Sequence, residues 1–408
     1  MAKLSLNSIP SKYFAVNSAH SERDEIIGLG RILMAEHARK GVSAMNTAMN
    51  RADNAGASMI DGKKYKEYNE KFQAGHLLYA AKLSCASAGT AAPVDFEDFK
   101  RNSIRFYKNE SFYAVLQGIY EEILTPILPR VYSEAVEPFA ETVGVGFGET
   151  YQLTVGSNDI PVFQDSSWGA SRSVPTNTFY AKDYVMNPSP RTAQMKFKWH
   201  QLISNNMDFG AFFANMTAGM YAKTMGMFSA AMVAAASDQT LIPSGLTGTF
   251  SNANWVLIAN KISAVNNVGL GNLMAFGGLV GLSKVLPNTV TGSTNVNMDA
   301  AIATLLGADY IKSGYLGEFM GVRLMPLVDA VVPGTQNGNV TTVLPQDKIW
   351  IMASSGRKPL TIAMNEDTPI TIEFDPEKSG DFMIGVNVTV ALDIVALFTS
   401  KVGLITIS

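Results

Sequence analysis

Charged side chains are scarce in this sequence. They make up 16% of its 408 residues, against about 25% in an average soluble protein. A soluble monomer of this length usually displays more charge on its surface, so the deficit predicts wide contacts with other subunits. The hydrophobic fraction of 47% excludes global disorder and is sufficient for a large core.

Cysteine is almost absent as well. Cys85 is the only one, which excludes a disulfide within the chain and predicts a reducing compartment. In the first ten residues, polar side chains and Pro10 interrupt any apolar run, so the sequence predicts no secretory signal peptide. The most apolar stretch, residues 209–236, is interrupted by polar side chains and predicts a buried helix rather than a membrane span. We therefore expect a soluble protein that is made in the cytoplasm and contacts no membrane.

The sequence also lacks a concentration of positive charge. Residues 1–110 carry 16 basic and 12 acidic side chains, and residues 111–408 carry 16 and 23, which gives net charges of +4 and −7 and a total of −3. Neither part has the clustered basic stripe that nucleic-acid binding requires.

Residues suited to catalysis are few and scattered. The four histidines show no metal-ligand spacing, no GxSxG motif surrounds any serine, and Cys85 has no histidine near it in the sequence. These histidines are His20, His37, His76 and His200. The sequence predicts no catalytic residue, no cofactor site and no metal site.

Two motifs imitate ligand-binding loops. Gly277–Gly281 resembles a dinucleotide fingerprint, but Phe276 occupies the place of the first glycine, so we interpret it as a strand-to-helix turn. Asp375–Gly380 resembles the start of a calcium loop, but Val386 replaces the glutamate at position twelve, so we interpret it as a hairpin turn.

The first 140 residues are dominated by helical patterns. Residues 1–20 predict an extended arm, since Pro10 and scattered serines and asparagines disfavour a helix. Helices are expected over 22–52 and 72–86, and a helical pattern runs from Phe96 to Glu141 before prolines divide it.

Residues 144–190 change to an extended pattern. Apolar side chains alternate at Tyr151, Leu153 and Val155, and a second extended run covers 178–186. A hairpin with about 20 residues in each strand would reach roughly 60 Å at about 3.3 Å per residue. We expect such an arm to be unable to pack on its own domain and to require a neighbouring subunit.

One long helix follows, and then a mixed region. Gln194–Ser204 alternates like a strand, and residues 208–237 predict a helix near 45 Å long at about 1.5 Å per residue. The sequence contains 20 methionines, several of them on this helix, for which core filling and adaptable packing against several neighbours both remain open. The later segments alternate between predicted helices (255–267, 279–286, 298–306) and predicted strands (322–327, 348–352, 360–362, 370–374, 382–398, 402–407).

This order of elements resembles that of the major capsid proteins of tailed bacteriophages, which share the Hong Kong phage 97-type shell fold. The resemblance rests on Gly307–Pro326, which reads GADYIKSGYLGEFMGVRLMP and is similar to a glycine-rich passage of that family's axial domain. It rests also on the tail 357–407, which is similar to the family's return into the peripheral domain. About 300 residues are covered, and residues 1–110 depart from the pattern.

The resemblance implies an α+β fold with a defined domain organisation. The expected parts are an N-terminal arm (1–20), a helical N-terminal region (21–110), a first part of the peripheral domain (111–143), an extended hairpin loop (144–190), the rest of the peripheral domain (191–250) with a spine helix (208–237), an axial domain (251–356) and return strands (357–408). Residues 1–110, which depart from the family pattern, would be either a retained helical addition or a scaffolding segment, and we favour retention. Some family members crosslink a loop lysine to a neighbour's asparagine, and Lys182 is the only lysine in the proposed loop.

The function implied is that of a major capsid protein that forms an icosahedral shell around double-stranded DNA, without enzymatic activity. Its partners would be copies of itself in pentamers and hexamers, together with portal, scaffolding and decoration proteins, and its location would be the virion. Two alternatives are a shell protein of an encapsulin-type compartment and, from another class, an oligomeric α/β enzyme.

Overall fold

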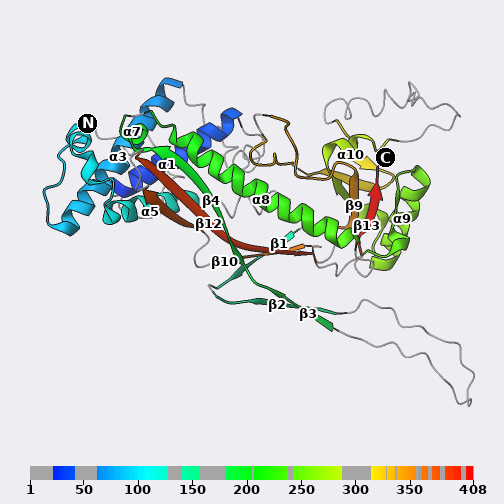
Figure 1. Ribbon diagram of the computed structural model, residues 1–408. Coiled ribbons are helices and arrows are strands. Elements are labelled where there is room, and N and C mark those ends of the chain that lie inside the picture. Colours follow the sequence, from blue (N-terminus) through cyan, green and yellow to red (C-terminus); the bar gives the residue numbers. More distant parts are fainter. Residues whose placement is uncertain are drawn as a thin grey trace, which may run out of the picture. The chain divides into compact units, whose positions relative to one another are not determined.

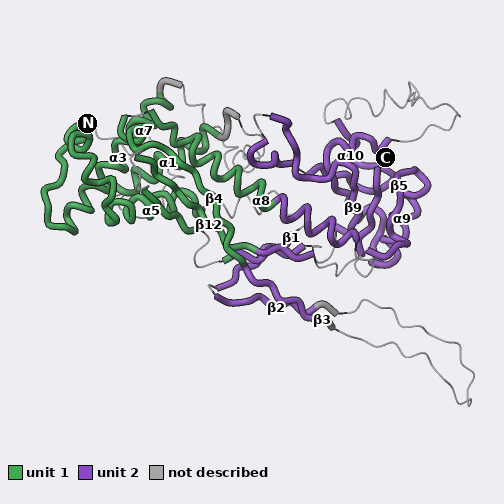
Figure 2. The backbone as a smooth tube through the Cα atoms, in the orientation of Figure 1, with its two compact units in different colours: residues 1–135, 189–224, 365–392 green, residues 136–188, 225–364, 393–408 purple. Residues whose placement is uncertain are grey.

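The computed structural model describes most of the chain. The described residues are 22–41, 62–126, 140–146, 148–156, 181–204, 206–237, 242–286, 314–327, 329–335, 338–354, 358, 360–365, 370–376, 382–396 and 401–407. The chain divides into two compact units, and both are assembled from segments distant in the sequence (Figure 2). Unit 1 comprises residues 1–135, 189–224 and 365–392, and unit 2 comprises residues 136–188, 225–364 and 393–408.

Three of the longer helices of unit 1 are α1 (Glu22–Gly41), α3 (Gly62–Ala88) and α5 (Glu110–Leu124). They pack against one another (Figure 1), and their contacts are close. A side chain on Gly30 of α1 would collide with Ile123 of α5, and a side chain on Gly210 would collide with the backbone of Leu33. Residues 22–41 and 62–88 are therefore an integral part of the core of unit 1.

Short capped helices connect α3 to α5. The side chain of Asp95 accepts a hydrogen bond from the Asp98 N–H at the start of α4 (Phe96–Arg101). A 3₁₀ turn, η3 (Ser103–Arg105), follows, and the side chain of Asn109 then accepts a hydrogen bond from the Phe112 N–H at the start of α5. Both residues act as N-caps, which satisfy backbone donors that the first turn of a helix leaves unpaired.

Three sequence predictions for unit 1 need correction. The second helix starts at residue 62 rather than 72, because the polar first turns are held by ion pairs four residues apart, Lys66–Glu70 and Lys71–Glu67. The helical pattern over 96–141 ends at Leu124, and β1 (Ala140–Val145) already covers its last residues. The predicted helix 22–52 is confirmed to residue 41, and 42–52 lie outside the described residues.

The third correction concerns the segment after residue 194. A strand predicted to residue 204 ends at Lys198, and Trp199–Ile203 form a short helix, α7. Its first turn is capped by the Gln201 side chain, which accepts a hydrogen bond from the Lys198 N–H at 3.2 Å. Trp199 and Leu202 are both buried, and three-residue spacing places them on one helical face.

The predicted long helix is confirmed as α8 (Phe209–Ser237). It begins where Asp208 accepts a hydrogen bond from the Ala211 N–H at 3.0 Å. Of the two roles left open for its methionines, core filling applies to four that are buried within the chain (Met216, Met220, Met225, Met232). Its first turns lie in unit 1, where their aromatic side chains join the core formed by α3 and α5.

The sheet strands of unit 1 are antiparallel. β12 (Met383–Ala396) pairs along one side with β4 (Ser189–Lys198) and along the other with β11 (Thr371–Pro376). The turn predicted over Asp375–Gly380 begins later than expected, because Asp375 and Pro376 still belong to β11 and pair with β12, and residues 377–381 lie outside the described residues. α5 packs against β11.

The main sheet of unit 2 has six strands in the order β5-β13-β9-β6-β8-β7. Its pairs are antiparallel except for β13 with β5 and β6 with β8. The strands are β5 (Thr247–Thr249), β6 (Leu273–Gly277), β7 (Glu318–Phe319), β8 (Val322–Pro326), β9 (Lys348–Ala353) and β13 (Gly403–Thr406). The helix α9 (Asn252–Asn266) packs against β5, β9 and β13.

In its described part, unit 2 also contains strands outside that sheet: β1, β2 (Tyr151–Gly156), β3 (Ala181–Met186), most of β10 (Leu360–Asn365) and the last residues of β12. All six residues of β10 are buried, and β10 pairs with β1. Single-turn 3₁₀ segments precede β5 and β6, η4 (Ser244–Leu246) and η5 (Leu270–Asn272). The predicted helix over 298–306 lies outside the described residues.

Candidate functional site

The strands β2 and β3 form a two-stranded antiparallel ladder that is separate from the larger sheets. Figure 2 shows the pair leaving the remainder of unit 2 as a narrow ribbon. In its register, Gln152 opposes Val185 and Thr154 opposes Asp183. The face carrying these four residues is exposed, and Val185 is 58% exposed. The Thr154 hydroxyl donates a hydrogen bond to the Asp183 carboxylate across the ladder.

The opposite face of the ladder is packed at its base. Leu153 is buried, and Met186 is fully buried in a cluster with Val145 and Ala363. The Asn187 N–H also donates to the Asp393 carboxylate at 3.2 Å. The prediction that this segment cannot pack on its own domain is therefore wrong for the base of the ladder, because Leu153 and Met186 are buried within the chain. Residues 157–180 lie outside the described residues.

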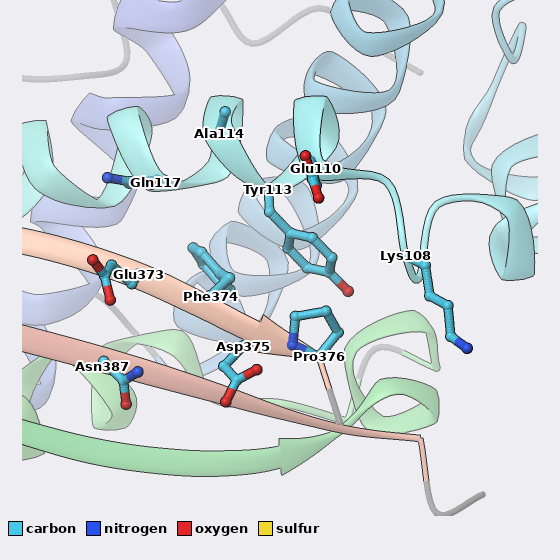
Figure 3. A pocket seen from close by; sticks show the side chains of 10 residues that line it. All are labelled: Lys108, Glu110, Tyr113, Ala114, Gln117, Glu373, Phe374, Asp375, Pro376 and Asn387. Carbon is cyan, nitrogen blue, oxygen red and sulfur yellow. The ribbon is translucent and has the colours of Figure 1, made fainter. Parts of the chain in front are cut away.

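A groove of about 630 Å³ lies in unit 1 between α5 and β11 (Figure 3). Its floor is aromatic, since the rings of Tyr113 and Phe374 stack with their centroids 5.5 Å apart. The Tyr113 hydroxyl donates to the backbone oxygen of Tyr107 at 2.7 Å, and burial raises the pKa of Tyr113 above its usual value. No sequence pattern indicates this site, because its two walls, residues 108–117 and 373–387, are more than 250 residues apart in the chain.

The rim of the groove is mainly acidic. Glu110 lies on the helix side, and Glu373 and Asp375 lie on the strand side (Figure 3). Lys108 stands at the end of the groove beyond Pro376. At neutral pH three carboxylates oppose one ammonium group, so the rim attracts positively charged groups.

The residues considered for catalysis are not brought together. His76 is buried, His37 lies 3.8 Å from a carboxylate oxygen of Asp208, and His200 is exposed. Cys85 is buried, and the Arg105 guanidinium donates a hydrogen bond to its sulfur. His20 lies outside the described residues. Within the described part of the chain, no group of three or more histidine, cysteine, aspartate or glutamate side chains could hold a metal ion.

His76 has a structural role at the centre of unit 1. Its Nδ1 donates to the backbone oxygen of Phe72 at 2.6 Å, and its Nε2 lies 3.2 Å from the Tyr120 hydroxyl, which donates to it. Its ring stacks on Phe72 and meets Phe209 edge-on. Burial lowers the pKa of His76 to about 4, and the hydrogen bond to Phe72 offsets part of this shift. The imidazole is therefore neutral and packs between α3, α5 and α8.

The first motif resembling a ligand-binding loop is explained by packing. β6 ends at Gly277 and α10 (Leu279–Ser283) follows, so the predicted strand-to-helix turn is confirmed. A side chain on Gly277 would lie 2.8 Å from the Lys348 oxygen, and one on Gly281 would lie 2.7 Å from the Gln346 oxygen. These glycines allow the backbone that leads into β9 to approach closely.

The segments that carried the family resemblance are partly described. Residues 314–326 contain the tight hairpin β7–β8, which turns at Met320 and Gly321 with positive φ angles of 48° and 80°. Residues 307–313 lie outside the described residues. Lys182 opposes Val155 in the ladder, and a crosslink through it stays a prediction. None of the described helices combines the length and hydropathy that a membrane-spanning segment requires.

Comparison with known proteins finds similarity among solved structures only. No family model and no curated protein matches the chain. The mature capsid of bacteriophage PhiM1 is 10% identical with a TM-score of 0.42, covering 67% of this chain and 86% of that one. The capsid of the native GTA particle is 13% identical with a TM-score of 0.44, covering 68% and 90%. The virus-like particle from Pyrococcus furiosus is 10% identical with a TM-score of 0.35, covering 66% and 90%.

Proposed function

We propose that this chain is the coat protein of an icosahedral shell, a major capsid protein of the tailed-phage type, and that it performs no catalysis. The observation that carries the proposal is the β2–β3 ladder, which is anchored at its base and exposed along one face. An isolated two-stranded ribbon is at best marginally stable in water. A ribbon of this kind gains stability when its exposed face meets another subunit, and identical copies provide that partner.

The low charge of the chain supports the same assignment. A closed shell requires each copy to offer several interfaces, and these interfaces must close on themselves instead of extending as a filament. Modest contacts suffice, because contacts made by one copy with several neighbours reinforce one another. Only 16% of the residues are charged, so much of the surface can enter such contacts without burying unpaired charges.

In the proposed shell, the N-terminal arm (1–20) and a helical N-terminal region (21–110) precede the peripheral domain. The peripheral domain consists of residues 111–143, 191–250 with the spine helix 208–237, and 357–408. The extended loop is 144–190, and the axial domain is 251–356. Copies group as pentamers and hexamers, and the shell encloses double-stranded DNA in the virion after assembly in the host cytoplasm. The net charge of −3 suits this content, because a strongly basic inner surface would immobilise DNA.

Negative-stain electron microscopy of the purified protein tests the proposal. We expect hollow polyhedral particles. Uniform small oligomers, with no closed particles at any protein concentration or salt, would contradict it. The ratio of absorbance at 260 nm to that at 280 nm in particles isolated from their natural source then separates a DNA-filled capsid from a compartment that encloses protein.

A further inference from the structure

The groove between α5 and β11 has a feature that a closed core lacks, namely the outer edge of a strand. The Ile372 N–H donates to Glu121 Oε1 at 2.9 Å, so this residue directs its backbone groups toward α5 and away from β12. Strand residues alternate with a period of two. The N–H and C=O of Phe374 therefore face the same way as those of Ile372, toward the groove.

An exposed strand edge next to an apolar floor is a site for an extended peptide. Backbone groups along the edge supply hydrogen bonds, and pockets beside it accept alternate side chains. Natural proteins also cover or interrupt such edges, because open edges pair with other chains. Here Glu121 covers the edge at Ile372, and Pro376 removes one donor at its other end. The stretch at Phe374 lies between them.

The chain contains a segment whose chemistry fits this groove. Residues 1–21 include Lys3 and Lys12 and contain no acidic residue, and the run at Tyr13, Phe14 and Val16 is apolar. Two lysines match the acidic rim, and the aromatic side chains match the floor of Tyr113 and Phe374. We propose that residues 1–21 of the same chain bind in the groove between α5 and β11 and cover the edge of β11. The proposal is independent of the shell function.

The start of α1 lies close enough to the groove for residues 1–21 to reach it. Arg23 forms an ion pair with Glu122 at 2.7 Å, and Glu22 lies 3.6 Å from the Lys82 ammonium. Glu122 is eight residues along α5 from Ala114 in the groove, which is roughly 12 Å at about 1.5 Å per residue. Twenty-one residues can span up to about 70 Å. Since the segment is tethered, its effective concentration at the groove is in the millimolar range, far above that of a second copy in dilute solution.

Engineered disulfides test the placement. Ala114 is exposed on α5 within the groove, so the full-length chain carrying Ala114→Cys is combined with Ser8→Cys, Ser11→Cys or Ala15→Cys. Under mild oxidation at low protein concentration we expect a disulfide within the chain, detected by mass spectrometry and non-reducing electrophoresis. The matched control replaces Ala114→Cys by Ala264→Cys on α9, which is also exposed and lies in unit 2. Buried Cys85 sets the background, measured in the single variants.

We expect at least one groove pair to exceed the control yield by about fivefold or more, since a docked segment raises the local thiol concentration. Glu373→Lys with Asp375→Lys should return that yield to the control value, while Glu67→Lys with Glu318→Lys, outside the groove, should not. Equal yields for groove and control pairs overturn the proposal. Disulfide-linked dimers in place of internal links also overturn it, and assign the groove to a second copy. Shell formation is not part of the readout, so failure here leaves the proposed function untouched.

Discussion

Two regions of the molecule differ in where their side chains find partners. One is the junction at which α3 contacts the start of α8 in unit 1, and the other is the β2–β3 ladder of unit 2. At the junction, Asn69 donates to the Met207 oxygen at 2.7 Å and accepts from the Phe209 N–H at 3.1 Å. Gln73 donates to the Leu202 oxygen from the same helix. The ladder buries one face at its base and exposes the other. The helices at the junction bury their facing side chains within one chain, with Gln73 Oε1 left without a hydrogen-bond partner, whereas the ladder leaves a whole face exposed for a partner.

This contrast bears on α1 and α3, which belong to the N-terminal region (1–110) that is expected to be either a retained addition or a scaffolding segment, with retention favoured. A removable scaffolding segment would contact the rest of the chain through a separable surface. Instead, α1 and α3 supply buried side chains to the same core as α5 and α8. The structure therefore favours retention of these helices, because removing them would expose Phe209 and Phe213 to water.

The largest expected effect comes from removing the ladder. We expect deletion of residues 150–185, replaced by Gly-Gly, to abolish shell formation while the subunit stays folded. Tyr151 and Met186 oppose each other in the register, so the cut ends lie close together and a short link can join them. The anchoring residues Met186, Val145 and Ala363 all remain.

Electron microscopy and circular dichroism measure the two parts of that prediction. A deletion variant that is unfolded would show that the segment belongs to a core and would contradict the comparison above. A deletion variant that still forms closed shells would show that the ladder is dispensable for assembly.

The second effect is a loss of stability at the junction. Phe72 is fully buried and contacts His76, Phe209 and Phe213. We expect Phe72→Ala to lower the free energy of unfolding by about 3–5 kcal/mol, as for other buried aromatic residues. Urea denaturation followed by circular dichroism measures it. Ile104→Ala, at a residue that is 71% exposed, is the control and should change stability by less than about 0.5 kcal/mol.

The third effect is a dependence of the junction on pH. The pKa of His76 is about 4 in the folded chain and about 6.5 in an unfolded one. The unfolded state therefore binds a proton at His76 more tightly than the folded state does. The contribution of neutral His76 to the free energy of unfolding is full above pH 6.5 and decreases as the pH drops toward 4. The difference corresponds to about 3 kcal/mol.

Urea denaturation between pH 7 and pH 4 measures this dependence. His76→Gln should unfold at lower urea at pH 7, and its stability should fall less steeply with acid than that of the unaltered chain. The same substitution at exposed His200 should leave the slope unchanged. An unaltered slope in His76→Gln would mean that other groups account for the acid sensitivity.

The helices and their buried faces could be predicted from the sequence, because the period of the apolar residues specifies them. Phe112, Leu116 and Ile119 lie on one face of α5 and are all buried, and the long helix was placed to within one residue. The periodic pattern could not show where Phe374 would lie, because the contact of β11 with α5 is set by pairing between distant segments. The groove could not be predicted from the sequence for the same reason.

Sequence reasoning also overestimated the isolation of the ladder. Alternation at Tyr151 and Leu153 correctly predicted a strand, but alternation alone does not specify which surface covers the apolar face. Met186 finds that surface on β1 and β10, at Val145 and Ala363. The period of two therefore predicted two amphipathic strands but did not specify which residues cover their apolar face.

The smallest effect on stability, and the sharpest test of the ladder as a contact surface, comes from Val185. We expect Val185→Lys to change the free energy of unfolding by less than about 0.5 kcal/mol, since the side chain is exposed in the single chain. In the assembled shell the new ammonium would lie in a contact, where an unpaired charge is costly. The protein concentration needed for assembly, followed by light scattering, should therefore rise several-fold. Val256→Lys on α9, at a valine that is 48% exposed, is the matched control for a lysine placed elsewhere in unit 2. Equal effects of the two substitutions on assembly would remove the distinction between the ladder and the rest of the surface.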